Sequence, residues 1–432
     1  MNNNSKYNNN SVRPLSEFLK DYPTFEQFVV SMYSAFRLCI KNKATSPSAL
    51  EFCAHKAENM LSLCRAVYNF EYVPKASIAF IVSVPTYREV IAADFADRIV
   101  QHWVVARIEP ILEGKNILDK HVYSCRAGKG NLAAVEAVEE EVFRKTNGYR
   151  QECAVASFDL KSFFMSIDKR ILYDRLVSLI NEHYHEGDKD ILLYLTRVIV
   201  FSLPQENAIR HSPDSEWEKL PKRKSLYHLP WYLGLPIGNL PSQHNANFYN
   251  SPAMHYIRSL GLTAINYVDD FYLVAKTKEQ ITQAMPYIRN YYKEHLGVVV
   301  HPNKFYLQPS SHGIRVLGGV VKYGRKYISN RTVSHLKQRM HAFNLLGTHY
   351  WRRRRFAEKY AATINSYFGI MRHYATYNIR KEAAEEIAQI WGDVLLFDQA
   401  VEKAVVRHKH CPIYHTRKWH RQRLQTYNNI AV

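Results

Sequence analysis

The sequence lacks any apolar run long enough to cross a membrane, and it has few cysteines. No run approaches the roughly 20 apolar residues that a membrane-spanning helix requires, and no signal-peptide pattern precedes the predicted fold. The six cysteines include no CxxC pair and no spacing typical of metal ligands. These absences argue against a membrane protein and a disulfide-rich secreted domain. They predict a cytoplasmic protein with reduced thiols.

Acidic residues are scarce relative to basic ones. The 432 residues include 58 Lys and Arg against 39 Asp and Glu, which gives a formal net charge of +19. An excess of this size predicts a polyanionic partner, because neutralising phosphates releases counterions and dominates nucleic-acid affinity. A basic protein of the membrane surface is the competing interpretation, and the lack of long apolar runs counts against it.

Two carboxylates inside an apolar segment are the most informative residues. Asp269 and Asp270 lie within residues 264–275, whose strand-forming residues predict a β-hairpin with both carboxylates at the turn. Adjacent like charges repel each other unless a cation lies nearby, and carboxylate oxygens are ligands that suit Mg²⁺ or Mn²⁺. A solvated surface turn is the alternative interpretation.

A third carboxylate, Asp159, ends an apolar run that predicts a buried strand. An unpaired carboxylate is costly to bury there, so it either reaches solvent or holds a cation. Together, Asp159, Asp269 and Asp270 predict a site that holds two metal ions for an in-line phosphoryl displacement.

Three motifs, two of which contain these aspartates, resemble motifs A, B and C of reverse transcriptases. They are, in the order of that family, FDLKSFF at 158–164, GLPIGNLPSQ at 234–243 and YVDD at 267–270. The resemblance implies an RNA-directed DNA polymerase that uses template RNA and dNTPs. It implies an α+β right-hand fold, with fingers, a palm of antiparallel sheet and helices, and a helical thumb. The three aspartates are then both catalytic residues and metal ligands, with Mg²⁺ as the cofactor and Mn²⁺ as the alternative.

Four segments follow from the resemblance and the composition. They are a disordered N-terminus over 1–14, N-terminal helices and fingers over 15–150, a palm over 151–325 with a fingers insertion at about 175–233, and a basic helical thumb with a C-terminal tail over 326–432. Within the insertion, residues 201–229 predict either an extended excursion or a solvated loop. Asp97 and Arg98 predict a structural ion pair.

The loop at residues 121–130 is a candidate nucleotide contact. Its glycines permit close backbone approach to a ligand, while Arg126 and Lys129 supply positive charge. A surface loop with two solvated cations is the alternative. The resemblance to reverse transcriptases adds further nucleotide contacts, which are Arg88, Phe164 as a steric gate against a 2′-hydroxyl, Ile237 and Gln243. Lys304, in a segment similar to motif D, is then the acid that protonates pyrophosphate, with a solvated lysine as the alternative.

The C-terminal quarter predicts contacts with a nucleic-acid backbone. Basic residues recur there among aromatic ones, and the candidates are Arg352, Arg353, Arg354, Arg355 and Arg372. This pattern favours a thumb that holds an RNA/cDNA duplex, and a merely solvated charged face is the alternative. The His-rich tail over 407–423 is assigned to RNA or protein contact, because no acidic or cysteine partner is spaced for a metal site.

Motif B resembles one branch of the family. Many reverse transcriptases read LPQGxxxSP, whereas here Ile237 replaces Gln and Gln243 replaces Pro. This IGxxxSQ form is similar to the reverse transcriptases of diversity-generating retroelements, within the group II intron-like family. The resemblance implies a bacterial or phage enzyme that makes error-prone, adenine-directed cDNA from a template-repeat RNA for mutagenic retrohoming. It also implies an accessory variability protein, normally a pentamer.

Two alternatives remain. A retron-like or antiphage-defence reverse transcriptase with a different template is the first, and the IGxxxSQ form argues against it. A catalytically silent RNA-binding scaffold is the second, and the intact Asp159, Asp269, Asp270 and Lys304 argue against it.

Overall fold

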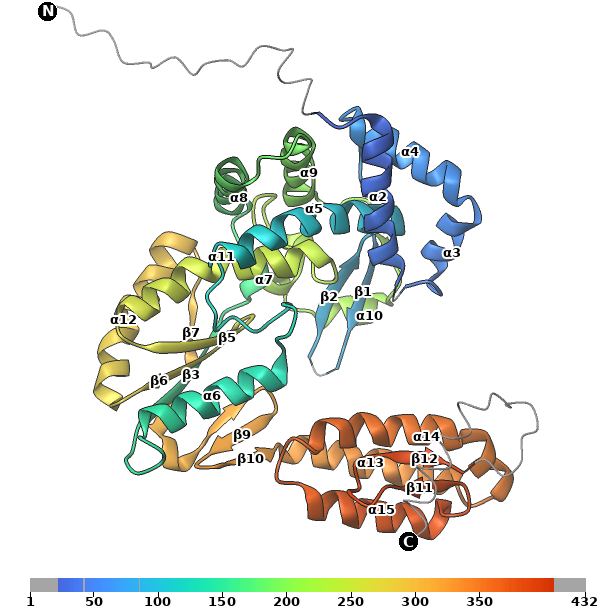
Figure 1. The fold of residues 1–432 in the computed structure, drawn as a ribbon, viewed down its shortest axis with the longest axis vertical. Coiled ribbons are helices and arrows are strands. Elements are labelled where there is room, and N and C mark those ends of the chain that lie inside the picture. The colour runs from blue at the N-terminus through green and yellow to red at the C-terminus, as the bar shows by residue number, and fades with distance from the viewer. Residues whose placement is uncertain (1–21, 42, 85, 408–432) are drawn as a thin grey trace, which may run out of the picture.

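The computed structural model describes residues 22–41, 43–84 and 86–407. Figure 1 shows N-terminal helices, a central sheet flanked by helices, and a C-terminal helical unit. The predicted α+β class is confirmed. The predicted disordered segment 1–14 and the His-rich tail beyond residue 407 lie outside the described residues. None of the helices in the described part combines the length and apolar character of a membrane span.

The N-terminal helices pack around one long helix. They are α2 (Phe25–Ile40), α3 (Pro47–Ala54), α4 (Lys56–Tyr68) and the long helix α5 (Phe95–Gly114). α2 begins with a capping box, in which the side chains of Thr24 and Gln27 each accept a backbone N–H of the other residue. It packs along α5, where the buried indole N–H of Trp103 donates to the Ser31 hydroxyl over 2.7 Å. Helices thus occupy the stretch before residue 70, where the apolar pattern predicts them.

The start of α5 differs from the prediction. The Asp97 carboxylate accepts the Tyr72 hydroxyl at 2.6 Å and the Lys75 backbone N–H at 3.0 Å. Arg98 instead donates from Nε to the Ala93 carbonyl at 2.9 Å. The predicted Asp97–Arg98 ion pair is therefore wrong, because adjacent residues on a helix do not face each other.

The first sheet joins the N-terminal region to the insertion. Its strands, in spatial order, are β2 (Arg88–Ala92), β1 (Ile78–Val82) and β4 (Ile209–Arg210). The insertion contains α8 (Lys169–His183), α9 (Lys189–Phe201), α10 (Asp214–Glu218) and the 3₁₀ turns η1 (Lys222–Lys224) and η2 (Leu226–His228). The buried Glu89 carboxylate accepts the Ser225 hydroxyl at 2.5 Å and the Leu226 backbone N–H at 2.8 Å. Residues 201–229 therefore fold back onto this sheet, and the predicted extended excursion is wrong.

A four-stranded antiparallel sheet forms the centre of the chain. Its strands, in spatial order, are β5 (Thr263–Tyr267), β6 (Asp270–Ala275), β3 (Ala154–Leu160) and β7 (Val300–Pro309). Side chains alternate between two apolar cores: Phe271 and Leu273 face one core, and Tyr272 and Val274 face the other. Helices α11 (Leu240–Ser259) and α12 (Lys278–Leu296) cover the first face. Both faces are buried, so the strand ends are where polar side chains can reach solvent.

The opposite face is covered by α6 (Asn131–Lys145) and by a small sheet of β8 (Ile314–Val316), β9 (Gly319–Lys322) and β10 (Arg325–Ile328). α6 precedes the predicted boundary at residue 150, yet it packs against β5 and β6. The division of the chain into fingers, palm and thumb at the predicted boundaries stays a prediction.

The C-terminal unit has a core of its own. It contains α13 (Asn330–Leu346), α14 (Tyr350–Met371), α15 (Tyr377–Trp391), β11 (Leu395–Phe397) and β12 (Ala404–Val406). Trp391 and Tyr360 are fully buried at its centre. Tyr374 contacts both this core and the core beneath the small sheet. Gly319 lies so close to its ring that a β-carbon there would be 2.7 Å from the Tyr374 ring.

The buried Asp97 generates a prediction about stability. Burial raises the pKa of Asp97 from 3.8 to about 6, so the folded chain binds this proton more tightly than the unfolded chain. The contribution of Asp97 to stability should therefore increase as the pH falls from 7 to 4, by at most roughly 3 kcal/mol. Denaturant unfolding of wild type and Asp97→Asn across this range measures it, and the difference in free energy should change with pH in that direction. Asp174→Asn, an exposed matched control, should give a flat difference. A flat difference for Asp97→Asn would contradict the prediction.

Candidate active site

Strand pairing brings the three predicted carboxylates to one end of the central sheet. β3 and β6 pair in a register that sets Asp159 opposite Asp270. The Leu160 backbone N–H also donates to the Asp269 carbonyl over 3.2 Å. Residues from two distant parts of the sequence therefore meet at the same strand ends, as the sequence predicts.

The β5–β6 hairpin has a two-residue turn. Tyr267 pairs with Asp270 across it, which leaves Val268 and Asp269 as the turn residues. The predicted hairpin over residues 264–275 is confirmed, with Asp270 as the first residue of β6. Val268 has a φ of 59°, which is unfavourable for a β-branched residue. The turn must therefore be held by contacts outside the hairpin.

Buried polar residues supply those contacts. The Asn266 side-chain amide donates to the carbonyls of Val268 at 3.0 Å and Asp270 at 3.3 Å. The Val268 backbone N–H donates to the Ser124 hydroxyl at 3.2 Å, and that hydroxyl donates to Asn247 Oδ1 at 2.7 Å. Sequence reasoning missed Ser124, Asn247 and Asn266. The available signal was a single asparagine inside the apolar strand before the YVDD motif.

The three carboxylates form a strongly anionic site. Burial, followed by the neighbouring Asp159 carboxylate, raises the pKa of Asp269. Burial, followed by the charges of Asp269 and Asp159, raises the pKa of Asp270 to about 6. The positive charges of Arg88 and Lys304 lower both pKa values and oppose these effects. Crowded carboxylates of this kind favour a bound cation.

Lys304 lies directly on one of these carboxylates. Strand β7 runs antiparallel to β3, and the Lys304 ammonium donates to Asp159 Oδ2. The other oxygen, Asp159 Oδ1, is buried and has no hydrogen-bond partner among the described residues. A buried carboxylate oxygen without a partner is unfavourable, so this atom needs a donor or a cation.

The three carboxylates are chemically suited to bind a divalent cation. Three carboxylates supply hard oxygen ligands, and Asp159 Oδ1 is an oxygen with no other partner in the described part of the chain. In the described residues, no three His, Cys, Asp or Glu side chains are arranged so that they hold a metal ion. Asp159 instead forms an ion pair with Lys304. Asp159, Asp269 and Asp270 are the residues that would hold such an ion.

Arg126 has a structural role in the loop at residues 121–130. Its guanidinium forms an ion pair with Glu113 and donates to the carbonyls of Asp119 at 2.7 Å and Val122 at 2.9 Å. Only 7% of the side chain is exposed. The predicted contact of Arg126 with a nucleotide is therefore corrected, because its donors are already used within the protein.

Lys129 is engaged in the same way. Its ammonium donates to the Lys120 carbonyl and lies 4.9 Å from the centroid of the Tyr123 ring. Burial lowers the pKa of Lys129. This ammonium holds the loop against the residues before it, and two of its three N–H donors stay free for a ligand, so the predicted nucleotide contact of Lys129 stays a prediction.

Ile237 lies in the loop before α11. Its carbonyl accepts the Ile91 backbone N–H at 2.9 Å, and its half-buried side chain packs against a small apolar cluster that includes Ile91 and Leu226. The next residue, Gly238, has a φ of 115°, and a β-carbon there would lie 2.8 Å from Val90 Cγ1. Glycine is therefore required for this loop to pack against β2.

The remaining predicted nucleotide contacts lie on neighbouring elements. Arg88 opens β2 and is exposed. Phe164 is half-buried in the short helix α7 (Phe163–Ser166), and its carbonyl accepts the Leu235 backbone N–H at 2.9 Å. Gln243 is exposed on α11, and its Oε1 accepts the Cys125 thiol at 3.0 Å. The roles of Arg88, Phe164 and Gln243 stay predictions.

The basic run on α14 divides into paired and exposed arginines. Arg353 donates to Asp393 at 3.0 Å and to the Gly347 carbonyl at 2.8 Å, so it ties α14 to neighbouring segments of the unit. Arg354 and Arg355 are exposed. Nucleic-acid contact therefore fits Arg354 and Arg355 better than Arg353.

Two further arginines were predicted to contact nucleic acid. The Arg352 guanidinium lies 5.1 Å from the Trp351 ring centroid, and Arg372 lies 3.6 Å from Glu402 in a partly exposed ion pair. Their contacts with nucleic acid stay predictions.

The comparison with protein families agrees with this arrangement. The family model for reverse transcriptase (RNA-dependent DNA polymerase) matches residues 73–321, which is more than half of the chain and includes every carboxylate of the site. The chain belongs to the reverse transcriptase family. RNA-directed DNA polymerase is accordingly its enzyme class, its fold is the α+β right-hand polymerase fold, and enzymes of this family use divalent metal ions. No curated protein sequence matches the chain.

Solved structures similar to this reverse transcriptase include telomerases from yeasts. One is telomerase from Candida albicans in complex with a fragment of telomeric RNA, with 11% identity and a TM-score of 0.42 over 75% of this chain and 60% of that chain. Another is apo telomerase from Candida tropicalis, with 10% identity and a TM-score of 0.43 over 78% of this chain and 68% of that chain. The chain spans about 60% of the length of the first of these telomerases.

Removal of one carboxylate should separate catalysis from RNA binding. Asp269→Asn removes a proposed metal ligand but no phosphate contact, so DNA synthesis on a primed RNA template should fall by about 100-fold or more. Binding of the same RNA should stay within about twofold, because phosphate neutralisation dominates it. The exposed Asp174→Asn removes the same charge on α8 and should leave both values unchanged. Synthesis near the wild-type rate in Asp269→Asn would contradict the assignment.

Proposed function

We propose that the chain is the reverse transcriptase of a diversity-generating retroelement, encoded by a bacterium or phage and acting in the cytoplasm. It copies a template-repeat RNA into cDNA, with errors concentrated opposite template adenines, for mutagenic retrohoming. The observation that carries this proposal is the IGxxxSQ form of motif B, in which Ile237 and Gln243 replace the Gln and Pro of many relatives.

The position of Ile237 supports reduced fidelity. Its backbone is fixed by the hydrogen bond to Ile91, and its side chain is apolar and half-buried. Such a side chain offers no hydrogen bond to an incoming nucleotide, whereas a glutamine amide does. A site that checks its substrate with hydrogen bonds discriminates more strongly than an apolar one. Ile237 therefore reduces the discrimination between correctly and incorrectly paired incoming nucleotides.

The carboxylate site supports nucleotidyl transfer. Asp159, Asp269 and Asp270 would hold Mg²⁺, or Mn²⁺, which when bound activates the primer hydroxyl and neutralises the triphosphate. The primer 3′-hydroxyl loses its proton to solvent as its oxygen forms a bond to the α-phosphorus of the dNTP, and the bond from that phosphorus to the pyrophosphate oxygen breaks. Lys304, already beside Asp159, gives a proton to the departing pyrophosphate. Arg88, exposed at the start of β2, contacts the triphosphate.

Two residues complete the proposed nucleotide site. Phe164 follows the strand that carries Asp159, and its half-buried ring excludes a 2′-hydroxyl. Gln243 contacts the nucleotide through its amide nitrogen, which remains available when Oε1 accepts the Cys125 thiol.

The charge of the chain supports contact with nucleic acid. A net charge of +19 and the exposed Arg354 and Arg355 on α14 favour an RNA/cDNA duplex along the C-terminal unit. This unit then acts as the thumb, with the first sheet in the fingers and the central sheet in the palm. An accessory variability protein, as a pentamer, is the proposed protein partner.

Fidelity is the most direct test. Ile237→Gln should lower misincorporation opposite template adenines severalfold while polymerisation is retained, because one hydrogen bond contributes about 0.5–1.5 kcal/mol net and 1.4 kcal/mol is tenfold. Ile237→Met is the matched control, since it has a similar volume and no amide, and its error spectrum should be unchanged. Sequencing of cDNA made in vitro from one RNA template measures the error spectra of wild type, Ile237→Gln and Ile237→Met. Equal spectra for wild type and Ile237→Gln would contradict the role of Ile237, and wild-type errors spread evenly over the four bases would contradict the retroelement proposal.

Salt dependence tests the thumb. Replacing Arg354 and Arg355 by Gln should weaken RNA binding and flatten the slope of log K against log salt, by up to about 0.7–0.9 for each phosphate that is no longer neutralised. The double control Arg37→Gln with Arg65→Gln removes the same charge from exposed positions on α2 and α4 and should leave the slope unchanged. An unchanged slope in the α14 variant would place these arginines against solvent or the protein partner.

A further inference from the structure

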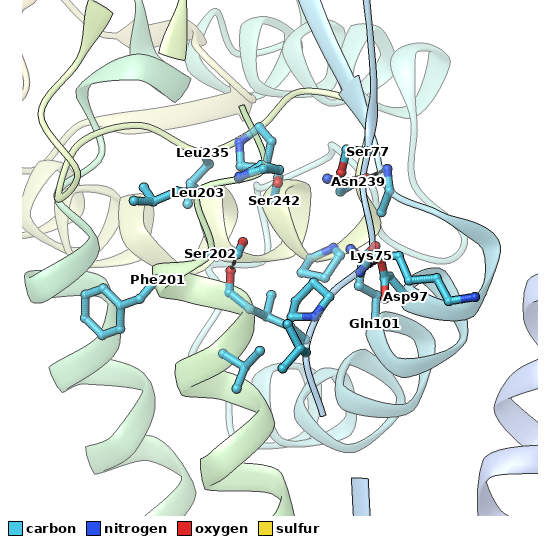
Figure 2. A pocket seen from close by; sticks show the side chains of 18 of the residues that line it. Lys75, Ser77, Asp97, Gln101, Phe201, Ser202, Leu203, Leu235, Asn239 and Ser242 are labelled. Atoms are coloured by element: carbon cyan, nitrogen blue, oxygen red, sulfur yellow. Dashed lines mark hydrogen bonds between the residues drawn. The ribbon is translucent and has the colours of Figure 1, made fainter. Parts of the chain in front are cut away.

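A cavity of about 600 Å³ lies behind the loop that carries motif B. It is bordered by α5, α9, the segment before β1 and the start of α11, and it opens to solvent on one side. Figure 2 shows side chains that line it. Its volume is in the range of ligand-binding sites in proteins. Its described lining contains none of the three carboxylates of the active site, so the cavity is a separate site.

The walls of the cavity are mostly apolar. Val198 and Leu203 line one side, and Leu235 and Pro236 line the side that belongs to the motif B loop. Apolar walls of this kind suit the faces of a planar ring system, because they remove its surface from water.

Two amide side chains in the lining lack partners among the described residues. Gln101 of α5 points into the cavity in Figure 2. It is 9% exposed, and its buried Oε1 has no hydrogen-bond partner in the described part of the chain. Asn245 of α11 is 8% exposed and forms no side-chain hydrogen bond with a described residue. A buried carbonyl oxygen without a partner requires a donor, which a ligand in the cavity can supply.

Positive charge lies at the edge of the cavity. Arg197 and Lys75 both line it and are exposed. Among the described residues Arg197 has no ion-pair partner, whereas the Lys75 ammonium lies 4.0 Å from Asp94 Oδ1 in an exposed, weak ion pair. Asp97 also lines the cavity, but its oxygens already accept the Tyr72 hydroxyl and the Lys75 backbone N–H. The edge therefore favours an anionic group on the ligand.

We propose that this cavity binds one unpaired nucleotide whose base carries an exocyclic amino group, as adenine does. The amino group donates to Gln101 Oε1, the Asn245 amide faces the ring nitrogens, and the phosphate lies at Arg197 and Lys75. Amide side chains pair with adenine in this way, through its amino group and ring nitrogen. The nucleotide is either free or an unpaired residue of bound RNA. The site goes beyond the proposed function, because it does not depend on which retroelement the enzyme serves.

Binding of two mononucleotides tests the site. Isothermal titration of the full chain with AMP and with UMP is done in EDTA, so that binding at the metal-dependent polymerase site is suppressed. AMP should bind at least about tenfold more tightly than UMP, because uracil has no amino group for Gln101. Equal affinities, or no binding of AMP, would overturn the proposal.

Variants locate the binding. Gln101→Leu should abolish the preference for AMP over UMP, and Arg197→Gln should weaken both ligands by a similar factor. Arg65→Gln, which removes an exposed charge on α4, should change neither. If Gln101→Leu is poorly folded, Val198→Trp fills the cavity from another wall and should abolish AMP binding while DNA synthesis continues. A preference for AMP that survives in a folded Gln101→Leu or Val198→Trp chain would overturn the assignment.

Competition identifies the source of the nucleotide. A short oligouridylate with one central adenosine and the all-uridine oligomer are each titrated against bound AMP. Displacement by the adenosine-containing RNA at concentrations at least about tenfold below those of AMP itself assigns the site to bound RNA, because backbone contacts add affinity. Displacement only at concentrations similar to AMP assigns it to the free nucleotide.

Discussion

Repulsion among three carboxylates at one end of the central sheet is the constraint on which the surrounding structure depends. Asp159, Asp269 and Asp270 are held together although burial and mutual charge raise the pKa values of the last two. Left to themselves, such groups would separate or take up protons. Cationic groups approach from two sides, since Arg88 begins β2 and Lys304 lies on β7. The central sheet therefore stores unfavourable electrostatic energy at these strand ends.

Hydrogen bonds between distant segments hold the carboxylates in place against this repulsion. The turn that carries Asp269 includes Val268 in a left-handed conformation, which persists only when its surroundings hold it. Ser124, from the loop before α6, and Asn247, from α11, form the buried hydrogen bonds that do so. Because low dielectric strengthens buried hydrogen bonds, the turn is positioned by three segments at once, although Asn266 Oδ1 has no hydrogen-bond partner among the described residues. Removing the side chain of Ser124 or Asn247 would leave its hydrogen-bond partner buried and unpaired.

The sequence predicts features that depend on local pattern. The α+β class, the hairpin over residues 264–275 and the convergence of the three aspartates follow from strand alternation and motif order. Contacts that depend on distant partners do not follow: Arg126 is held by Glu113 and by backbone carbonyls. Likewise, the Glu89 carboxylate holds residues 225 and 226 of the insertion on the first sheet, where the sequence predicted either an extended excursion or a solvated loop. Charge in a sequence shows that a partner exists but not whether that partner is a ligand or another part of the chain.

The contact between Gly319 and Tyr374 has a consequence for the orientation of the C-terminal unit. Tyr374 packs against two separate cores, and its ring fits against β9 only because Gly319 has no side chain. The close contact between the Tyr374 ring and the Gly319 backbone thus joins the C-terminal unit to the small sheet. A larger residue at Gly319 would clash with this ring, so Tyr374 could not keep its present contact with β9. A single position in the small sheet therefore decides how closely the C-terminal unit packs against β9.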